Sequence, residues 1–168
     1  RALRDITNKH NGSYTASAVG EVNVVQMMKD TKAVIGGEGN GGIIYPALHY
    51  GRDSLVGVAL FLSHLVEQKT TVSGLRASYP SYYMSKQKIA LTPQIDVDAI
   101  LEKMAETYKA EEITTIDGVK IDFESNWVHL RKSNTEPIIR IYTEAVTQDA
   151  ADSLANTIIG EIKQIAGL

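Results

Sequence analysis

A run of basic, hydroxyl and amide side chains near the end of the chain has the composition of an oxyanion-binding loop. Residues 131–140 read RKSNTEPIIR. Arginine forks form bidentate, charge-assisted hydrogen bonds with phosphate oxygens, and hydroxyl, amide and backbone N–H groups satisfy the remaining oxygens. Arg140 lies inside the apolar run 138–142, where a charge costs stability unless it is paired or faces a ligand. The run thus holds three cations, two hydroxyls and an amide within ten residues.

The same segment has a purely structural alternative. Arg140 could form an ion pair with Glu136 or Glu144, and residues 131–137 could be a solvated loop that binds nothing. The residue types alone leave both interpretations open.

A second candidate binding loop is rich in glycine. Residues 36–42 read GGEGNGG, which holds five of the 13 glycines of the chain and satisfies the G-x-G-x-x-G pattern of dinucleotide-binding loops. In such loops a helix opens at the last glycine, but here Ile43–Tyr45 and then Pro46 follow, so this function is disfavoured. Bare backbone flanking Glu38 and Asn40 suits close approach to a hydroxylated ligand, because these side chains accept and donate hydrogen bonds. A plain surface turn is the alternative.

The composition argues against several other kinds of site. The 168 residues include no Cys, which rules out disulfides, thiolate metal sites and a cysteine nucleophile. The formal charge of −3 disfavours nucleic-acid binding. The four His are scattered, the acidic residues form no cluster, and no Ser-His-Asp arrangement stands out, so neither a metal site nor a catalytic residue is expected. No apolar run approaches the ~20 residues of a membrane span and no signal peptide is evident, so we expect a cytoplasmic protein without a membrane partner.

The first 72 residues alternate helix-like and strand-like segments. Residues 1–10 and 22–28 predict helices, and residues 33–35 and 43–45 predict short buried strands. Asp53 is a plausible N-cap for a helix over residues 54–68. Alternation of this kind predicts an α/β domain at 1–72, with a partial, mixed sheet and flanking helices.

The rest of the chain has a different pattern. Residues 73–88 carry turn-forming residues and predict a linker. Between residues 70 and 92, only the segment 89–91 suggests a strand. Asp96 and Asp149 are expected to start two helices, and strands are expected at 113–116, 119–123, 127–130 and 138–142. Asp117-Gly118 is a strong hairpin signal, because this turn needs positive φ. Residues 89–168 therefore predict a small α+β domain, an antiparallel sheet covered by two helices.

The two loops, in this order, resemble those of the α-D-phosphohexomutases, the family of phosphoglucomutases, phosphomannomutases and phosphoglucosamine mutases. Residues 37–42 look like the sugar-binding loop of that family, and residues 131–137 with Arg140 look like its phosphate-binding loop. The segments 18–21 (AVGE) and 117–122 (DGVKID) also fit.

The resemblance implies a four-domain enzyme of which residues 1–72 are domain three, without its first strand, and residues 89–168 are domain four. The phosphoserine and the Mg²⁺ site belong to the first two domains, so the resemblance implies no catalytic residue, metal or cofactor in this chain. It implies a phosphosugar substrate, the missing N-terminal domains as partners, and no turnover by this chain alone. A stand-alone phosphate-binding module without catalysis is the alternative.

By the same resemblance, Glu38 and Asn40 bind sugar hydroxyls. The residues that it implies for the phosphate that is not transferred are Arg131, Ser133, Asn134, Thr135 and Arg140. The full enzyme would move a phosphoryl group between O1 and O6 through a bisphosphate. Many relatives have Ser in place of Asn40 and His in place of Gly42, and some have His in place of Glu21. These departures leave the preferred hexose open.

Overall fold

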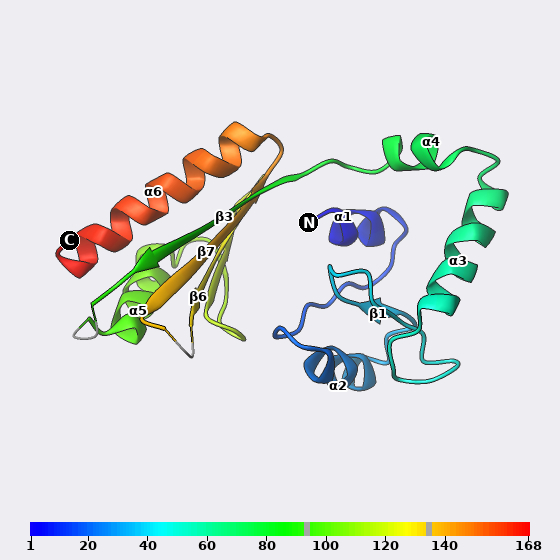
Figure 1. Cartoon of the computed structure of the whole chain (residues 1–168), viewed down its shortest axis with the longest axis horizontal. Helices are drawn as coiled ribbons and strands as arrows, with labels where there is room; N and C mark the ends of the chain where they lie inside the picture. The colour runs from blue at the N-terminus through cyan, green and yellow to red at the C-terminus, as the bar shows by residue number, and fades with distance from the viewer. Residues whose placement is uncertain (93–94, 134–135) are drawn as a thin grey trace. The chain divides into compact units, whose positions relative to one another are not determined.

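The computed structural model describes residues 1–92, 95–133 and 136–168 (Figure 1). The chain forms two compact units, residues 2–80 and residues 81–168 together with Arg1. Helices and short strands alternate in the first unit: α1 (Ala2–Lys9), α2 (Glu21–Thr31), β1 (Gly36–Gly37), β2 (Ile43–Ile44), α3 (Ser54–Glu67) and α4 (Val72–Ala77). The second contains β3 (Tyr83–Ala90), α5 (Val97–Thr107), β4 (Glu112–Thr114), β5 (Val119–Asp122), β6 (Trp127–Lys132), β7 (Ile138–Ala145) and α6 (Gln148–Ala166).

In residues 2–80, the described strands form one small sheet, in which the two residues of β1 pair with the two residues of β2. This pairing is antiparallel, whereas a mixed sheet was expected. The predicted strand at 33–35 is wrong by position, because pairing begins only at Gly36. The reason is steric. A Cβ on Gly36 would lie 2.3 Å from the Met28 sulfur, and one on Gly37 would lie 2.2 Å from the Gly42 carbonyl oxygen. Only the glycine backbone can come this close to α2 and to the facing strand.

Helix α3 begins at the predicted cap. The Asp53 carboxylate accepts a hydrogen bond from the Val56 backbone N–H at 3.0 Å, and its other oxygen lies 3.2 Å from His49 Nε2. The bond from Val56 holds the pKa of Asp53 below its ordinary value of 3.8, and His49 acts in the same direction. The Asp53 backbone N–H donates to the Ile43 carbonyl at 2.8 Å, which ties the start of α3 to the end of the glycine hairpin.

The second unit is a five-stranded antiparallel sheet in the order β3-β7-β6-β5-β4, and α5 and α6 pack on it. Its core contains alternate residues of the strands, such as Val128, Leu130, Ile139 and Ile141, which are buried with Ile158 and Ile162 of α6. The remaining alternate residues project from the opposite face of the sheet, here called the open face because α5 and α6 lie on the other side. The predicted α+β class is confirmed, with the expected two helices on the antiparallel sheet.

The expectation that only residues 89–91 form a strand before α5 is wrong. Strand β3 extends from Tyr83 to Ala90 and pairs with β7 along its whole length, so most of the expected linker at 73–88 is occupied by α4 and this strand. The strand is at the edge of the sheet, and only Ser85 and Ile89 are buried in it. Edge strands carry exposed polar residues on both faces, which is why the sequence lacks the usual alternation.

The hairpin between β4 and β5 depends on one glycine. Gly118 has φ of +74°, and a Cβ there would lie 2.1 Å from the Leu130 carbonyl oxygen and 3.2 Å from the Cα of Arg131. The turn is therefore pressed against the backbone of β6, which no other residue type permits without displacement.

Gly118→Ala is expected to destabilise the second unit by at least ~2 kcal/mol, because it adds both left-handed strain and a backbone clash. Gly160→Ala is the matched control. Gly160 lies inside α6, where an added Cβ would meet open space, so alanine should stabilise the helix by about 0.5–1 kcal/mol. Urea unfolding of both variants measures the difference. Equal midpoints for the two variants would contradict the steric account.

The lowered pKa of Asp53 predicts a pH dependence of α3. A carboxylate whose pKa is lower in the folded state contributes stability above its ordinary value of 3.8, and this contribution is lost as pH falls through the lower, folded value. NMR shifts of the Val56 amide should therefore titrate below 3.8 in the folded chain. Asp53→Asn keeps an oxygen acceptor for the cap and should remove this transition. A Val56 transition at or above 3.8 would refute the prediction.

Candidate functional site

The glycine loop is a tight hairpin turn between β1 and β2. The Glu38 N–H donates to the Gly42 carbonyl at 3.2 Å, and the Gly41 N–H donates to the Glu38 carbonyl at 3.1 Å. Gly41 has φ of +90°, which favours glycine. The backbone of the turn is thus ordered by its own hydrogen bonds, and its side chains are exposed or half-buried.

The structure brings Glu38 and Asn40 together. Asn40 Oδ1 accepts from the Gly42 N–H at 2.9 Å, and Asn40 Nδ2 lies 3.4 Å from Glu38 Oε2. The amide therefore closes the turn with one end and orients the Glu38 carboxylate with the other. A carboxylate held in this way is a pure acceptor, suited to hydroxyl or ammonium donors.

An ion pair that the sequence did not predict, between Arg52 and Glu21, lies beside this loop. Arg52 Nε forms an ion pair with Glu21 Oε2 at 2.8 Å, which links the first residue of α2 to the segment before α3. The Arg52 side chain also leaves little room for a side chain at position 42, because a Cβ on Gly42 would lie 2.7 Å from Arg52 Cδ. The motif at 18–21 pointed to Glu21, but no local signal pointed to Arg52.

In the second unit, Arg131 of β6 and Arg140 of β7 are direct partners in the antiparallel register. Side chains of directly opposed residues lie on the same face of a sheet, with Cα atoms about 4.5–5.5 Å apart. Their neighbours Leu130 and Ile141 are buried in the core, so both guanidinium groups belong to the open face. Two cations separated by eight residues in sequence are therefore adjacent in the fold.

Arg131 is held by the β4–β5 hairpin. Its Nε lies 3.1 Å from Asp117 Oδ1, and the Asp117 carbonyl oxygen lies 2.5 Å from His129 Nε2. Asp117 thus contacts two neighbouring side chains of β6, one through its carboxylate and one through its backbone. The constraint at Gly118 places Asp117 where it can do so.

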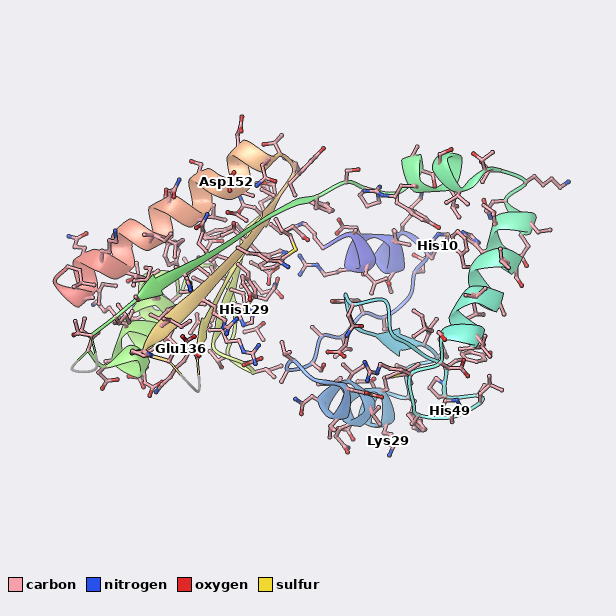
Figure 2. All side chains as sticks on the ribbon, in the orientation of Figure 1. His10, Lys29, His49, His129, Glu136 and Asp152 are labelled. Atoms are coloured by element: carbon pink, nitrogen blue, oxygen red, sulfur yellow. The ribbon has the colours of Figure 1, made fainter. Side chains whose placement is uncertain are left out.

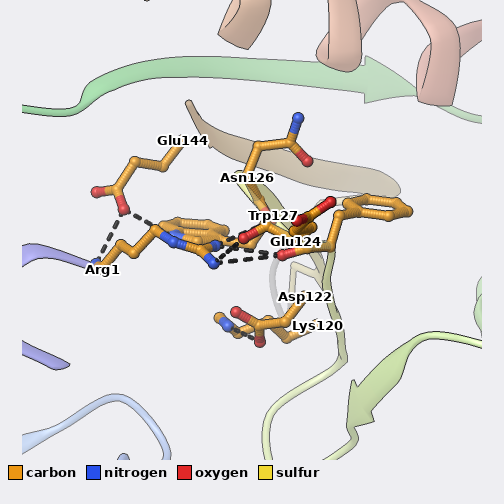
Figure 3. A network of polar contacts seen from close by, with 8 residues as sticks. Arg1, Lys120, Asp122, Glu124, Asn126, Trp127 and Glu144 are labelled. Atoms are coloured by element: carbon orange, nitrogen blue, oxygen red, sulfur yellow. Dashed lines mark hydrogen bonds and ion pairs between the residues drawn. The ribbon is translucent and has the colours of Figure 1, made fainter. Parts of the chain in front are cut away.

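The structural alternative for Arg140 finds no support among the described residues, where Arg140 forms no ion pair with Glu136 or Glu144. The Glu144 carboxylate instead accepts from Trp127 Nε1 at 2.8 Å and lies 2.9 Å from the backbone nitrogen of Arg1 (Figure 3). Arg140 itself is exposed.

Figure 3 shows the rest of the cluster around Trp127. The Arg1 guanidinium donates to the carbonyls of Phe123, Glu124 and Asn126, which caps the β5–β6 turn. Lys120 pairs with Asp122, and its ammonium lies 5.3 Å from the Trp127 ring centroid. The Glu144 carboxylate is thus engaged by Trp127 and the Arg1 backbone nitrogen, and the Asp122 carboxylate by Lys120.

The loop that joins β6 to β7 is closed by a backbone hydrogen bond from the Ser133 N–H to the Ile138 carbonyl at 3.1 Å. Ser133 is buried at this closure. The remaining predicted phosphate ligands, Asn134 and Thr135, lie outside the described residues.

No group of three or more His, Asp or Glu side chains within residues 1–92, 95–133 and 136–168 could hold a metal ion. The labelled histidines lie in separate segments, His10 after α1, His49 before α3 and His129 on β6 (Figure 2).

Within the same described ranges, the helices are too short or too polar to cross a bilayer.

Comparison with known proteins covers both units. Residues 1–83 match the family model for the phosphoglucomutase/phosphomannomutase alpha/beta/alpha domain III, and residues 87–161 match the model for the C-terminal domain of the same family. The chain is 36% identical to a phosphoglucosamine/phosphogalactosamine mutase of Sulfurisphaera tokodaii over 97% of its own length and 35% of the relative's. It is also 36% identical to a phosphoglucomutase/phosphomannomutase of Thermococcus kodakarensis, over 89% of the chain and 33% of the relative.

Among solved structures, the chain is similar to a phosphoglucomutase/phosphomannomutase family protein of Burkholderia thailandensis. The TM-score is 0.75 with 21% identity, over 98% of this chain and 35% of that one. At this identity the likeness concerns the fold. The chain therefore spans about a third of the length of the proteins it resembles.

Proposed function

The chain belongs to the phosphoglucomutase/phosphomannomutase family, and from this membership we propose that it forms the substrate-binding part of a phosphohexomutase. The full enzyme would interconvert the 1-phosphate and 6-phosphate of an α-D-hexose or hexosamine. The observation that carries the proposal is the register of β6 against β7, which sets Arg131 and Arg140 side by side on the open face.

Five residues of the segment 131–140 would bind the phosphate that is not being transferred: Arg131, Ser133, Asn134, Thr135 and Arg140. Two adjacent guanidinium groups offer forked N–H donors that match tetrahedral phosphate oxygens, and each charge-assisted bond contributes about 1.5–3 kcal/mol. Arg131 is oriented by Asp117, while Arg140 is exposed and has no carboxylate partner among the described residues. Ser133, Asn134 and Thr135 would supply further donors from the loop.

Residues 36–42 would recognise the sugar. Glu38 accepts hydrogen bonds from hydroxyl groups, or from an ammonium group in a hexosamine, and Asn40 holds its carboxylate in place. We assign residues 1–72 to sugar recognition and residues 89–168 to phosphate recognition on this basis.

The chemistry itself would be supplied by other segments of the enzyme. The family resemblance places the phosphoserine and the Mg²⁺ site in the first two domains, so no transfer step is assigned to this chain. Its contribution would be to bind and orient the substrate: binding energy on the remote phosphate can be used to align the reacting one. We also propose a cytoplasmic location, because a dianionic sugar phosphate does not cross a bilayer unaided.

A second candidate is a phosphate-ligand binding module that acts without catalysis, supported by the same arginine pair. The two candidates differ in whether phosphosugar turnover appears when this chain is joined to the serine- and Mg²⁺-bearing domains of a relative. Turnover by the 168 residues alone would contradict both.

Arg140→Gln is expected to reduce binding of glucose 6-phosphate at least about 10-fold, since it removes a charge-assisted fork without burying a new group. Lys132→Gln is the matched control, because Lys132 is the adjacent cation on β6 but pairs with Asp98 at the start of α5. Calorimetry or NMR titration of the full chain gives both affinities. Unchanged affinity in Arg140→Gln would reject the phosphate assignment.

Glu38→Gln tests the sugar loop separately. It should weaken binding of glucose 6-phosphate about 10-fold, through loss of a charged acceptor, and leave binding of inorganic phosphate within about 2-fold. Equal losses for the two ligands would show that Glu38 acts on folding or on the phosphate and not on the sugar.

A further inference from the structure

The arginine pair on the open face continues onto a third strand. Lys88 of the edge strand β3 is the direct register partner of Arg140, which is itself the direct partner of Arg131. The three side chains therefore form one row across β3, β7 and β6, here called the cationic row. Lys88 and Arg140 are exposed and Arg131 is half-buried.

Such a row is unfavourable without a counterion. Like charges that lie directly opposite each other on neighbouring strands destabilise a sheet. Asp117 compensates Arg131 at 3.1 Å, but no described carboxylate pairs with Arg140 or Lys88. The row and Asp117 together thus carry two net positive charges. Without Lys88 they would carry one.

The neighbouring row of the open face is different. Lys86 lies 5.8 Å from the centroid of the Tyr142 ring, and His129 contacts the Asp117 carbonyl. Lys86 therefore has an aromatic partner next to it on the open face. Both lysines also suit an edge strand, because charged side chains prevent pairing with another chain. Only Lys88 shares a row with the two arginines.

We propose that Lys88 is a further phosphate-binding residue, and that it makes the site select a dianionic phosphate monoester over a monoanionic ester of the same shape. The inference rests on the proposed function, since it concerns the same site. A phosphate monoester has a second pKa of about 6 and is a dianion at neutral pH. Two net positive charges match this dianion, whereas the arginine pair with Asp117 alone matches a monoanion.

The test compares glucose 6-phosphate with glucose 6-sulfate, a tetrahedral ester that carries a single charge. The full 168-residue chain is titrated with each at neutral pH and low salt. Because Coulomb energy scales with ligand charge, Lys88→Gln should weaken phosphate binding about 10-fold and sulfate binding only about 3-fold. Lys88→Arg, which keeps the charge, should stay within about 2-fold of the parent chain for both ligands.

Lys86→Gln is the matched control, because it removes a cation from the same strand and the same face one row away. It should change both affinities less than about 2-fold. Equal losses in Lys86→Gln and Lys88→Gln would overturn the proposal in favour of a diffuse surface charge. Unchanged affinities in Lys88→Gln, with self-association of the variant, would overturn it in favour of edge protection.

The outcome also separates this inference from the function on which it rests. If Arg140→Gln abolishes phosphosugar binding while Lys88→Gln leaves it intact, Lys88 has no binding role and the proposed function stands. If the parent chain binds neither inorganic phosphate nor glucose 6-phosphate at millimolar concentration, the proposed function and the role of Lys88 are both refuted.

Discussion

The antiparallel register of β6 against β7 is the constraint on which the candidate phosphate site depends. Side chains alternate between the two faces, so burying Leu130 and Ile141 in the core requires Arg131 and Arg140 to project together from the open face. A slip of one residue would put charged groups into the core. The same hydrophobic burial that stabilises the unit thus specifies where its positive charge is concentrated.

The β4–β5 hairpin connects this electrostatic arrangement to the backbone. Gly118 allows the turn to approach β6 closely, and Asp117 then pairs with Arg131 and contacts His129. The glycine loop of the first unit uses a related device. Glycine there admits close backbone contacts, and the one amide side chain of the turn, Asn40, orders Glu38. In both places glycine, which has no Cβ, lets the backbone come close enough to its neighbours to place a charged side chain beside it.

Much of the fold could be predicted from local signals. The caps at Asp53 and Asp96 and the Asp117-Gly118 turn were located from residue type, because their chemistry is satisfied within a few residues. Strand β3 was missed because an edge strand buries only part of one face and lacks a regular pattern. The strand expected at 33–35 was misplaced because Val34 and Ile35, although apolar, are 78% and 50% exposed in the structure.

The sequence by itself determined which chemistry the chain can offer: forked cations, hydroxyls and a carboxylate in two loops, with no thiol. It did so because hydrogen-bonding capacity and charge belong to the residue types. Only the tertiary structure decided which of these groups are neighbours. Asp117 with Arg131, Glu21 with Arg52 and Lys88 with Arg140 are all brought together by strand register or element packing over distances in the sequence that no local pattern spans.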